Sequence, residues 1–426
     1  MGSRRTAATV RAEREPDARG VPPRERRTLG KVVFALGLIY IATTLLDGFR
    51  AGIGTPARYA GMAFVAVWLL MRLTDRHSLR IPRAASYPLA LLVVWSLITV
   101  FWSWAPSRSL ASAGTLLALA LSAVAIADTY WDRLPAPAYA LTVGGVIAGA
   151  LTLATPPDTV EDGGDYVGRA AISGFDPNTL ALYLVLATSA AIYCLILNPR
   201  ASIKFALVIA CLVLVAATIA SGSKTGFGAV VGVGVIALFV SLRGVKSAVT
   251  AVVAIGAVLM LFSVMRSAGL IPTRLLAFIA APVVNDARVE IIDQFRYFES
   301  IWQLQGVGIG ADANFLLAVS GVYLNAHNFF WRVWIETGMI GLLAWGMVLY
   351  YVVRGGIKMK DKRWPLLALP PLVAFFYTLA PIYTKSVWVM FGIALTGYWT
   401  RRHAYSRRRR LRSDMPEHEA VGGRHD

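Results

Sequence analysis

Long apolar stretches separated by short polar connections fill most of this chain. Twelve of them approach the roughly 20 residues that a helix needs to cross a bilayer. They cover residues 32–46, 59–73, 87–104, 110–127, 139–154, 180–197, 205–220, 227–242, 248–264, 329–353, 365–379 and 387–399. The pattern predicts an all-α integral membrane protein with about twelve transmembrane helices. Residues 205–264 are the region where three spans are hardest to tell from two, because the connections are brief.

The two ends of the chain differ from the apolar middle. Residues 1–30 are rich in Arg, Pro and Ala and hold almost no large apolar side chain, so they cannot bury a core. The first apolar run lacks a convincing cleavage site and is predicted to stay as the first helix. We therefore expect a membrane domain over 31–400, between a basic tail at 1–30 and another at 401–426.

Composition and charge narrow the class further. Apolar residues make up 57% of the chain and charged residues 15%, against roughly 45–50% and 25% in soluble domains, which excludes an ordinary soluble enzyme. With both termini inside, 31 of the 42 Lys and Arg fall on the cytoplasmic side, as the positive-inside rule requires. The excess positive charge then suits anionic membrane lipids and not nucleic acid. Cys194 and Cys211 lie inside apolar runs, so no disulfide framework is predicted.

Two outer segments are too long for simple connections, and long ordered loops tend to carry function. The first, 155–178, is acidic and contains Gly and Pro turns. The second, 266–328, is expected to be a large periplasmic loop with short amphipathic helices. In it, Asn285 or Asp286 can cap a helix that presents Ile292, Phe295, Phe298 and Trp302 at helical spacing and ends at Gly306.

His327 is the one histidine expected on the outer side, at the start of the tenth stretch. An interfacial histidine is often only a polar anchor, but imidazole also titrates near neutral pH and can act as a base. Arg332 and Glu336 follow four residues apart, which predicts an intrahelical ion pair that either holds this helix end or contacts a substrate.

The spacing after His327 carries a resemblance. His327 and Asn328 are followed by nine residues, Gly338, two residues and Gly341, a pattern that resembles the O-antigen ligase family, whose core is shared with Wzy-type polysaccharide polymerases. The chain departs from the family pattern at Leu342, where Thr is usual. Three further stretches look like family segments in the same order: SGFDPNTLALYL, SGSKTG with Lys224 in place of the commoner Arg, and the run from DARVEII to GVGIGADANF.

The resemblance implies a glycosyltransferase that moves a glycan from undecaprenyl diphosphate to a lipid A-core hydroxyl on the periplasmic face of the bacterial inner membrane. Such a reaction needs chiefly a base for the acceptor proton and cations for the departing diphosphate. His327 is the candidate base. The candidate substrate-binding residues are Arg288, Arg296, Lys224, Arg169, Asn178 and Asn328. No cofactor or metal is expected, although the acidic residues Asp158, Glu161, Asp162 and Asp165 leave a metal-dependent alternative open.

Other interpretations stay open at this point. A Wzy-type O-antigen or exopolysaccharide polymerase would use the same donor with another lipid-linked glycan as acceptor. Twelve spans also describe a transporter or flippase, but the long segment 266–328 breaks the two-fold symmetry expected of one. The glycines of GVGIG either offer backbone N–H groups to a phosphate or form a tight turn.

Overall fold

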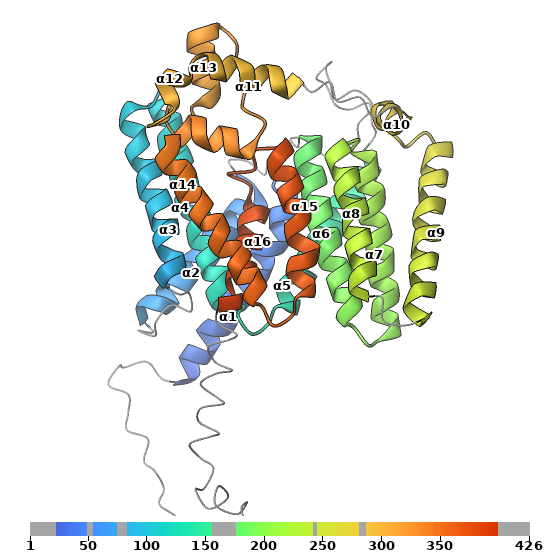
Figure 1. Ribbon diagram of the computed structural model, residues 1–426. Helices are drawn as coiled ribbons and strands as arrows, with labels where there is room; N and C mark the ends of the chain where they lie inside the picture. Colours follow the sequence, from blue (N-terminus) through green and yellow to red (C-terminus); the bar gives the residue numbers. More distant parts are fainter. Residues whose placement is uncertain are drawn as a thin grey trace, which may run out of the picture.

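The computed structural model describes residues 23–48, 54–74, 83–155, 176–241, 245–280 and 287–398, with the side chains of 23–27, 83, 245–255, 274 and 287–290 outside this description. Within these residues the fold is built from helices, as predicted. The helices α1–α9 and α14–α16 run roughly parallel in a bundle, and α10–α13 lie across one of its ends (Figure 1).

The bounds of the bundle helices follow the apolar stretches closely. The helices are α1 (Pro23–Thr43), α2 (Pro56–Thr74), α3 (Arg83–Ile98), α4 (Pro106–Thr129), α5 (Pro135–Ala154), α6 (Pro177–Leu197), α7 (Ala201–Ala220), α8 (Lys224–Ser241), α9 (Val245–Ser267), α14 (Phe329–Lys358), α15 (Arg363–Thr378) and α16 (Lys385–Leu395). Short 3₁₀ turns, η1 (Thr44–Leu46) and η2 (Thr99–Trp102), extend α1 and α3. Residues 205–264 thus contain three helices, α7, α8 and α9.

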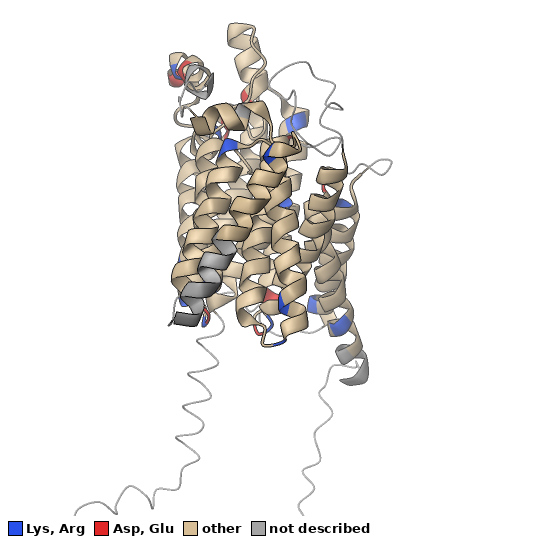
Figure 2. Cartoon of the chain, turned by 90° about the vertical axis from the view of Figure 1, so that its right-hand side faces the viewer, with Lys and Arg blue, Asp and Glu red and all other residues tan. Residues whose placement is uncertain are grey.

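Eight of these helices are long and apolar enough to cross a membrane. They are α1 with η1, α3 with η2, α4, α5, α6, α7, α8 and α14. Lys, Arg, Asp and Glu residues gather toward the two ends of the bundle (Figure 2), because an unpaired charge is costly within a bilayer. The chain is therefore a multi-pass helical membrane protein.

Local sequence explains several helix starts. Proline opens α4, α5 and α6, at the position where its missing N–H costs nothing. Asp176 caps α6 by accepting a hydrogen bond from the Thr179 backbone N–H at 2.9 Å. Helix α6 packs against α5, α7, α8 and α15 and is apolar on all sides, as expected for a helix buried within a bundle.

The segment that connects α9 to α14 forms a small layer over one end of the bundle (Figure 1). It contains α10 (Thr273–Ala280), α11 (Ala287–Tyr297), α12 (Glu299–Trp302) and α13 (Asp312–Ser320). The expected single helix up to Gly306 is split into α11 and α12, because the backbone leaves the helical region at Phe298, with φ −107° and ψ 23°. The expected caps Asn285 and Asp286 lie outside the described residues.

The apolar face expected for that helix is confirmed in part, since Ile292 and Phe298 are only half-buried. Phe295 and Trp302 are fully buried and form a second hydrophobic core with Phe315 of α13 and Ile335 of α14. The Trp302 ring N–H donates to the Phe295 carbonyl at 3.0 Å, which joins the two helix fragments across the break. This small core holds the α11–α13 layer against the start of α14.

Candidate functional site

The end of the bundle beneath α11–α13 holds the candidate base, His327, in the connection between α13 and α14. Hydrogen bonds hold the residues directly before and after it, Ala326 and Asn328. The Ala326 backbone N–H donates to Asp312 Oδ2 at 3.0 Å, and Asn328 caps α14 by accepting from the N–H groups of Phe330 and Trp331 at 3.0 and 3.2 Å. Ala326 and Asn328 are buried, whereas the His327 side chain is exposed. The local structure therefore presents the imidazole to the surface from a firmly held backbone.

Asn328 also joins α14 to the next bundle helix. Its amide Nδ2 donates to the Tyr377 carbonyl of α15 at 3.0 Å. Its side chain, expected to bind substrate, thus uses its oxygen and one amide hydrogen within the protein. Phe329, the next residue, stacks on Phe376 of α15 with ring centroids 4.4 Å apart. These contacts fix the start of α14 relative to α15.

Helix α14 kinks at Gly338, whose φ of 64° and ψ of −169° lie in a region open essentially to glycine alone. The kink allows the GVGIG turn to cross α14 at close range. Val307 N–H donates to the Ile335 carbonyl at 2.9 Å and Gly308 N–H to the Glu336 carbonyl at 3.0 Å. A side chain at Gly306 would collide with the backbone of α14. These bonds favour the tight-turn interpretation of GVGIG over phosphate binding.

A cluster of buried charged side chains lies about one helical turn into α14, past the connection that holds His327. Arg332 Nε is 2.7 Å from Glu336 Oε1 and 3.4 Å from Asp312 Oδ2, so the ion pair predicted from the four-residue spacing is confirmed. Glu336 and Asp312 are 1% and 0% exposed. Tyr383, between α15 and α16, donates its hydroxyl to Glu336 Oε2 at 3.0 Å. Burial, and then the Glu336 carboxylate, raise the pKa of Tyr383, which keeps the phenol a neutral donor.

This charge cluster is connected to the backbone beside His327 by an ion pair and a hydrogen bond. Arg332 balances Asp312, and Asp312 holds the Ala326 N–H directly before the histidine. Asp312 was not identified from sequence, although an acidic residue before the apolar run NFLLAV was a usable signal. Tyr383 gave no signal at all, because only the packing of α14 beside α15 and α16 brings it to Glu336.

Three of the other predicted residues, Asn178, Lys224 and Arg296, lie at the same end of the bundle. Asn178 lies in the first turn of α6, with Nδ2 3.4 Å from Asp176 Oδ1. Lys224 begins α8 and its ammonium lies 5.1 Å from the centre of the Phe278 ring of α10. Arg296 on α11 is exposed and lies 3.7 Å from Asp293. Arg288 belongs to α11, but its side chain lies outside the description, and Arg169 lies outside the described residues altogether.

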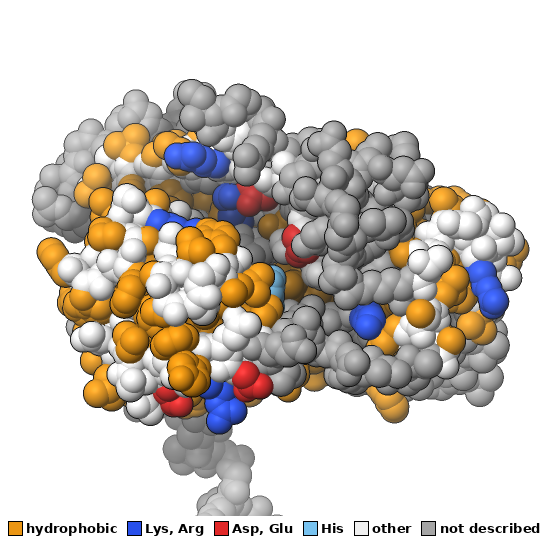
Figure 3. Space-filling model, turned by 90° about the horizontal axis from the view of Figure 1, so that it is seen from above, with side chains coloured by type: hydrophobic (Ala, Val, Ile, Leu, Met, Phe, Trp, Pro, Cys, Tyr) orange, Lys and Arg blue, Asp and Glu red, His pale blue; other side chains and the backbone are white. Residues whose placement is uncertain are grey.

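Seen from this end, the surface is hollowed, and acidic and basic side chains lie next to each other within the hollow (Figure 3). The described residues contain no group of three or more His, Cys, Asp or Glu that could hold a metal ion. The acidic residues Asp158, Glu161, Asp162 and Asp165 of the metal-dependent alternative lie outside the description. The site thus combines an exposed imidazole with a rigid, charge-paired support.

No protein-family model and no curated protein sequence matches this chain. What the fold and site define is a class: a multi-pass helical membrane protein with an exposed histidine at one end of its bundle.

Proposed function

We propose that this protein is a membrane glycosyltransferase of the O-antigen ligase type. It transfers glycan from undecaprenyl diphosphate to a hydroxyl of a lipid A-core acceptor on the periplasmic face of the bacterial inner membrane. The observation that carries the proposal is the setting of His327 in the His-Asn-x9-Gly-x2-Gly spacing. Its exposed imidazole lies between Ala326, whose backbone N–H donates to the buried Asp312 side chain, and Asn328, whose buried side chain accepts from the Phe330 N–H and caps α14.

The proposed topology has twelve spans, with α2, α9, α15 and α16 crossing together with the eight longer apolar helices. What supports it is that these four run alongside the others in the bundle (Figure 1). The connections 198–200 and 359–362 lie at the end where α1 begins and α16 ends, and they are followed or flanked by Lys and Arg. The positive-inside rule then makes this end cytoplasmic and the His327 end periplasmic.

The proposed reaction is a substitution at the anomeric carbon of the donor sugar. The acceptor hydroxyl oxygen forms the new bond to that carbon while the bond from carbon to the phosphate oxygen breaks, and its electron pair leaves with the diphosphate. His327 takes the proton of the hydroxyl, and such a positioned base contributes about 10²- to 10⁴-fold in rate. Diphosphate is a good leaving group, so cations and not a general acid complete the site.

The cations proposed for the diphosphate are Arg288, Arg296, Lys224 and Arg169, since guanidinium groups bind phosphate oxygens in pairs. Arg288→Ala tests this against Arg274→Ala, a matched change in the same connecting segment. We expect donor turnover to fall far more in the first variant, and equal losses contradict the assignment. Transfer is expected to persist in EDTA; inhibition reversed by a divalent ion would instead support the metal-dependent alternative.

The alternative that uses the same donor chemistry is a Wzy-type polymerase. The segment SGSKTG favours it, because this segment resembles one in exopolysaccharide polymerases. The glycolipid profile of a strain that lacks the gene separates the two. Ligase function predicts that lipopolysaccharide loses its glycan cap while long polymer stays on undecaprenyl diphosphate. Single repeats on the carrier, or secreted polymer lost with intact lipopolysaccharide, indicate a polymerase, and an unchanged profile contradicts both.

A further inference from the structure

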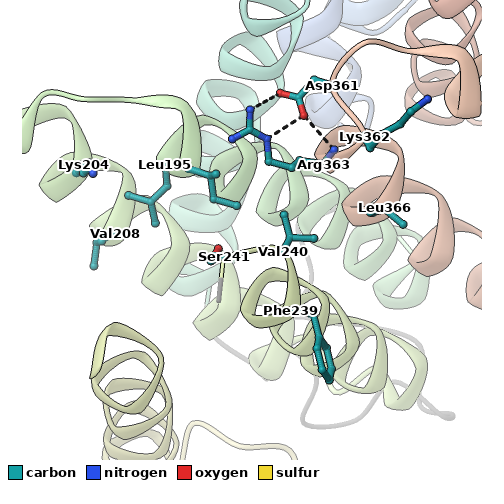
Figure 4. A pocket seen from close by; sticks show the side chains of 11 residues that line it. Leu195, Lys204, Val208, Phe239, Val240, Ser241, Asp361, Lys362, Arg363 and Leu366 are labelled. Carbon is teal, nitrogen blue, oxygen red and sulfur yellow. Dashed lines mark hydrogen bonds and ion pairs between the residues drawn. The ribbon is translucent and has the colours of Figure 1, made fainter. Parts of the chain in front are cut away.

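A cavity of about 1110 Å³ opens at the end of the bundle opposite His327, between α6, α7, α8 and α15 (Figure 4). Its wall is largely apolar. The apolar lining side chains are Leu195, Ile196, Val208, Phe239, Val240 and Leu366. Phe239 and Leu366 are 76% and 49% exposed, so this wall continues into the outer apolar surface of the bundle.

The remaining lining is polar and mostly cationic. Lys204, Lys362 and Arg363 line the cavity together with a single carboxylate, Asp361. Arg363 already holds that carboxylate with two hydrogen bonds of 2.8 Å. Burial raises the pKa of Asp361, but the bonds from Arg363 outweigh burial and keep the pKa below its ordinary value, so the pair stays ionised.

The two lysines supply the uncompensated charge. Both are exposed, and neither forms an ion pair with an acidic side chain in the described part of the chain. In Figure 4 they lie on opposite sides of the Asp361–Arg363 pair, Lys204 on α7 and Lys362 just before α15. The cavity therefore has a positive rim above an apolar wall.

We propose that this cavity binds a phospholipid with an anionic headgroup. The positive charge of the lysines at the rim attracts the headgroup phosphate, and an acyl chain lies along the wall formed by α7, α8 and α15. Charge complementarity selects the occupant, because basic pockets between membrane helices attract anionic headgroups. The volume exceeds the range of about 300–1,000 Å³ that holds a drug-sized ligand, which leaves room for a headgroup and part of a chain. The inference does not depend on the proposed transferase function.

Native mass spectrometry of the full chain in detergent, titrated with phosphatidylglycerol, tests the proposal. The double variant Lys204→Ala/Lys362→Ala is expected to bind the lipid about 30-fold more weakly than the unchanged protein. The matched control is Arg354→Ala/Lys360→Ala, which removes the same charge from the same end of the bundle without touching the cavity lining. Equal binding by the two double variants overturns the proposal.

A second variant separates the lipid from a free phosphate. Leu366→Trp enlarges a half-exposed side chain of the wall and leaves every cation in place, so we expect it to weaken phosphatidylglycerol binding. Phosphatidylcholine is expected to bind weakly to all variants. Equal binding of phosphatidylcholine, or displacement of phosphatidylglycerol by millimolar inorganic phosphate with no effect of Leu366→Trp, shows that no anionic-lipid site exists here.

Discussion

Replacing Arg332 by Met should destabilise the protein more than any conservative change at its surface. The variant keeps the length of the side chain but leaves Glu336 and Asp312 buried without their cation. With an effective dielectric constant of about 20, the attractions at 2.7 and 3.4 Å amount to roughly 6 and 5 kcal/mol. Most of that offsets the cost of burying the ions, so we expect a net loss of about 3–5 kcal/mol in the free energy of unfolding.

The assay is unfolding in mixed detergent micelles, followed by tryptophan fluorescence, with Asp312→Asn as the matched comparison. Asparagine still accepts from the Ala326 N–H and removes one of the two carboxylates that share Arg332. We expect the free energy of unfolding of Asp312→Asn to lie within about 1 kcal/mol of that of the unchanged protein, because the substitution removes a charge and keeps the hydrogen bond.

The double variant Arg332→Met/Asp312→Asn completes the cycle. It leaves one buried carboxylate unpaired instead of two, so it should be more stable than Arg332→Met alone. Two results would show that Arg332 does not balance both carboxylates: a loss of less than about 1 kcal/mol in Arg332→Met, or a double variant less stable than Arg332→Met. Either result would contradict the support inferred for the His327 connection.

Three further predictions concern single contacts. Gly338→Ala places a side chain where φ is 64° and the Leu304 carbonyl is close; the strain of about 1–3 kcal/mol should lower the thermal midpoint, and an unchanged midpoint would contradict the kink. Asn328→Ala removes the cap of α14 and should cost about 0.5–2 kcal/mol, whereas Asn328→Asp should keep most of it. Asp361→Asn should cost less than about 1 kcal/mol at neutral pH. Since the pKa of Asp361 is lowered in the folded protein, its contribution to stability is present above the ordinary pKa of 3.8 and fades as the pH falls below that value. A stability difference between the unchanged protein and Asp361→Asn that grows in acid would refute this.

The sequence was sufficient to locate the helices of the bundle, because apolar runs of nearly bilayer length leave few alternatives. Each of the twelve predicted stretches lies for most of its length on a helix of the described residues. The amphipathic helix over the end of the bundle was also predicted, but its break at Phe298 was not. The Trp302 ring N–H reaches back across that break to the Phe295 carbonyl, a contact that periodicity does not encode.

At the candidate site, local contacts were predictable and distant ones were not. The Arg332–Glu336 pair follows from helix geometry, and the structure confirms it. Asp312 and Tyr383 join the same cluster from positions 20 residues before and 51 residues after Arg332, so only tertiary packing brings them together. The glycines of GVGIG illustrate the same limit, since their role is set by the kinked helix that they cross.

The most direct test of the proposed function is glycan transfer by the purified protein from an undecaprenyl-diphosphate-linked donor to lipid A-core. His327→Ala is compared with Val322→Ala, a change in the same connection between α13 and α14. The account predicts that the histidine variant folds normally and loses transfer by at least about a hundredfold, while the control keeps it. Full transfer by a well-folded His327→Ala protein would contradict the catalytic role of His327.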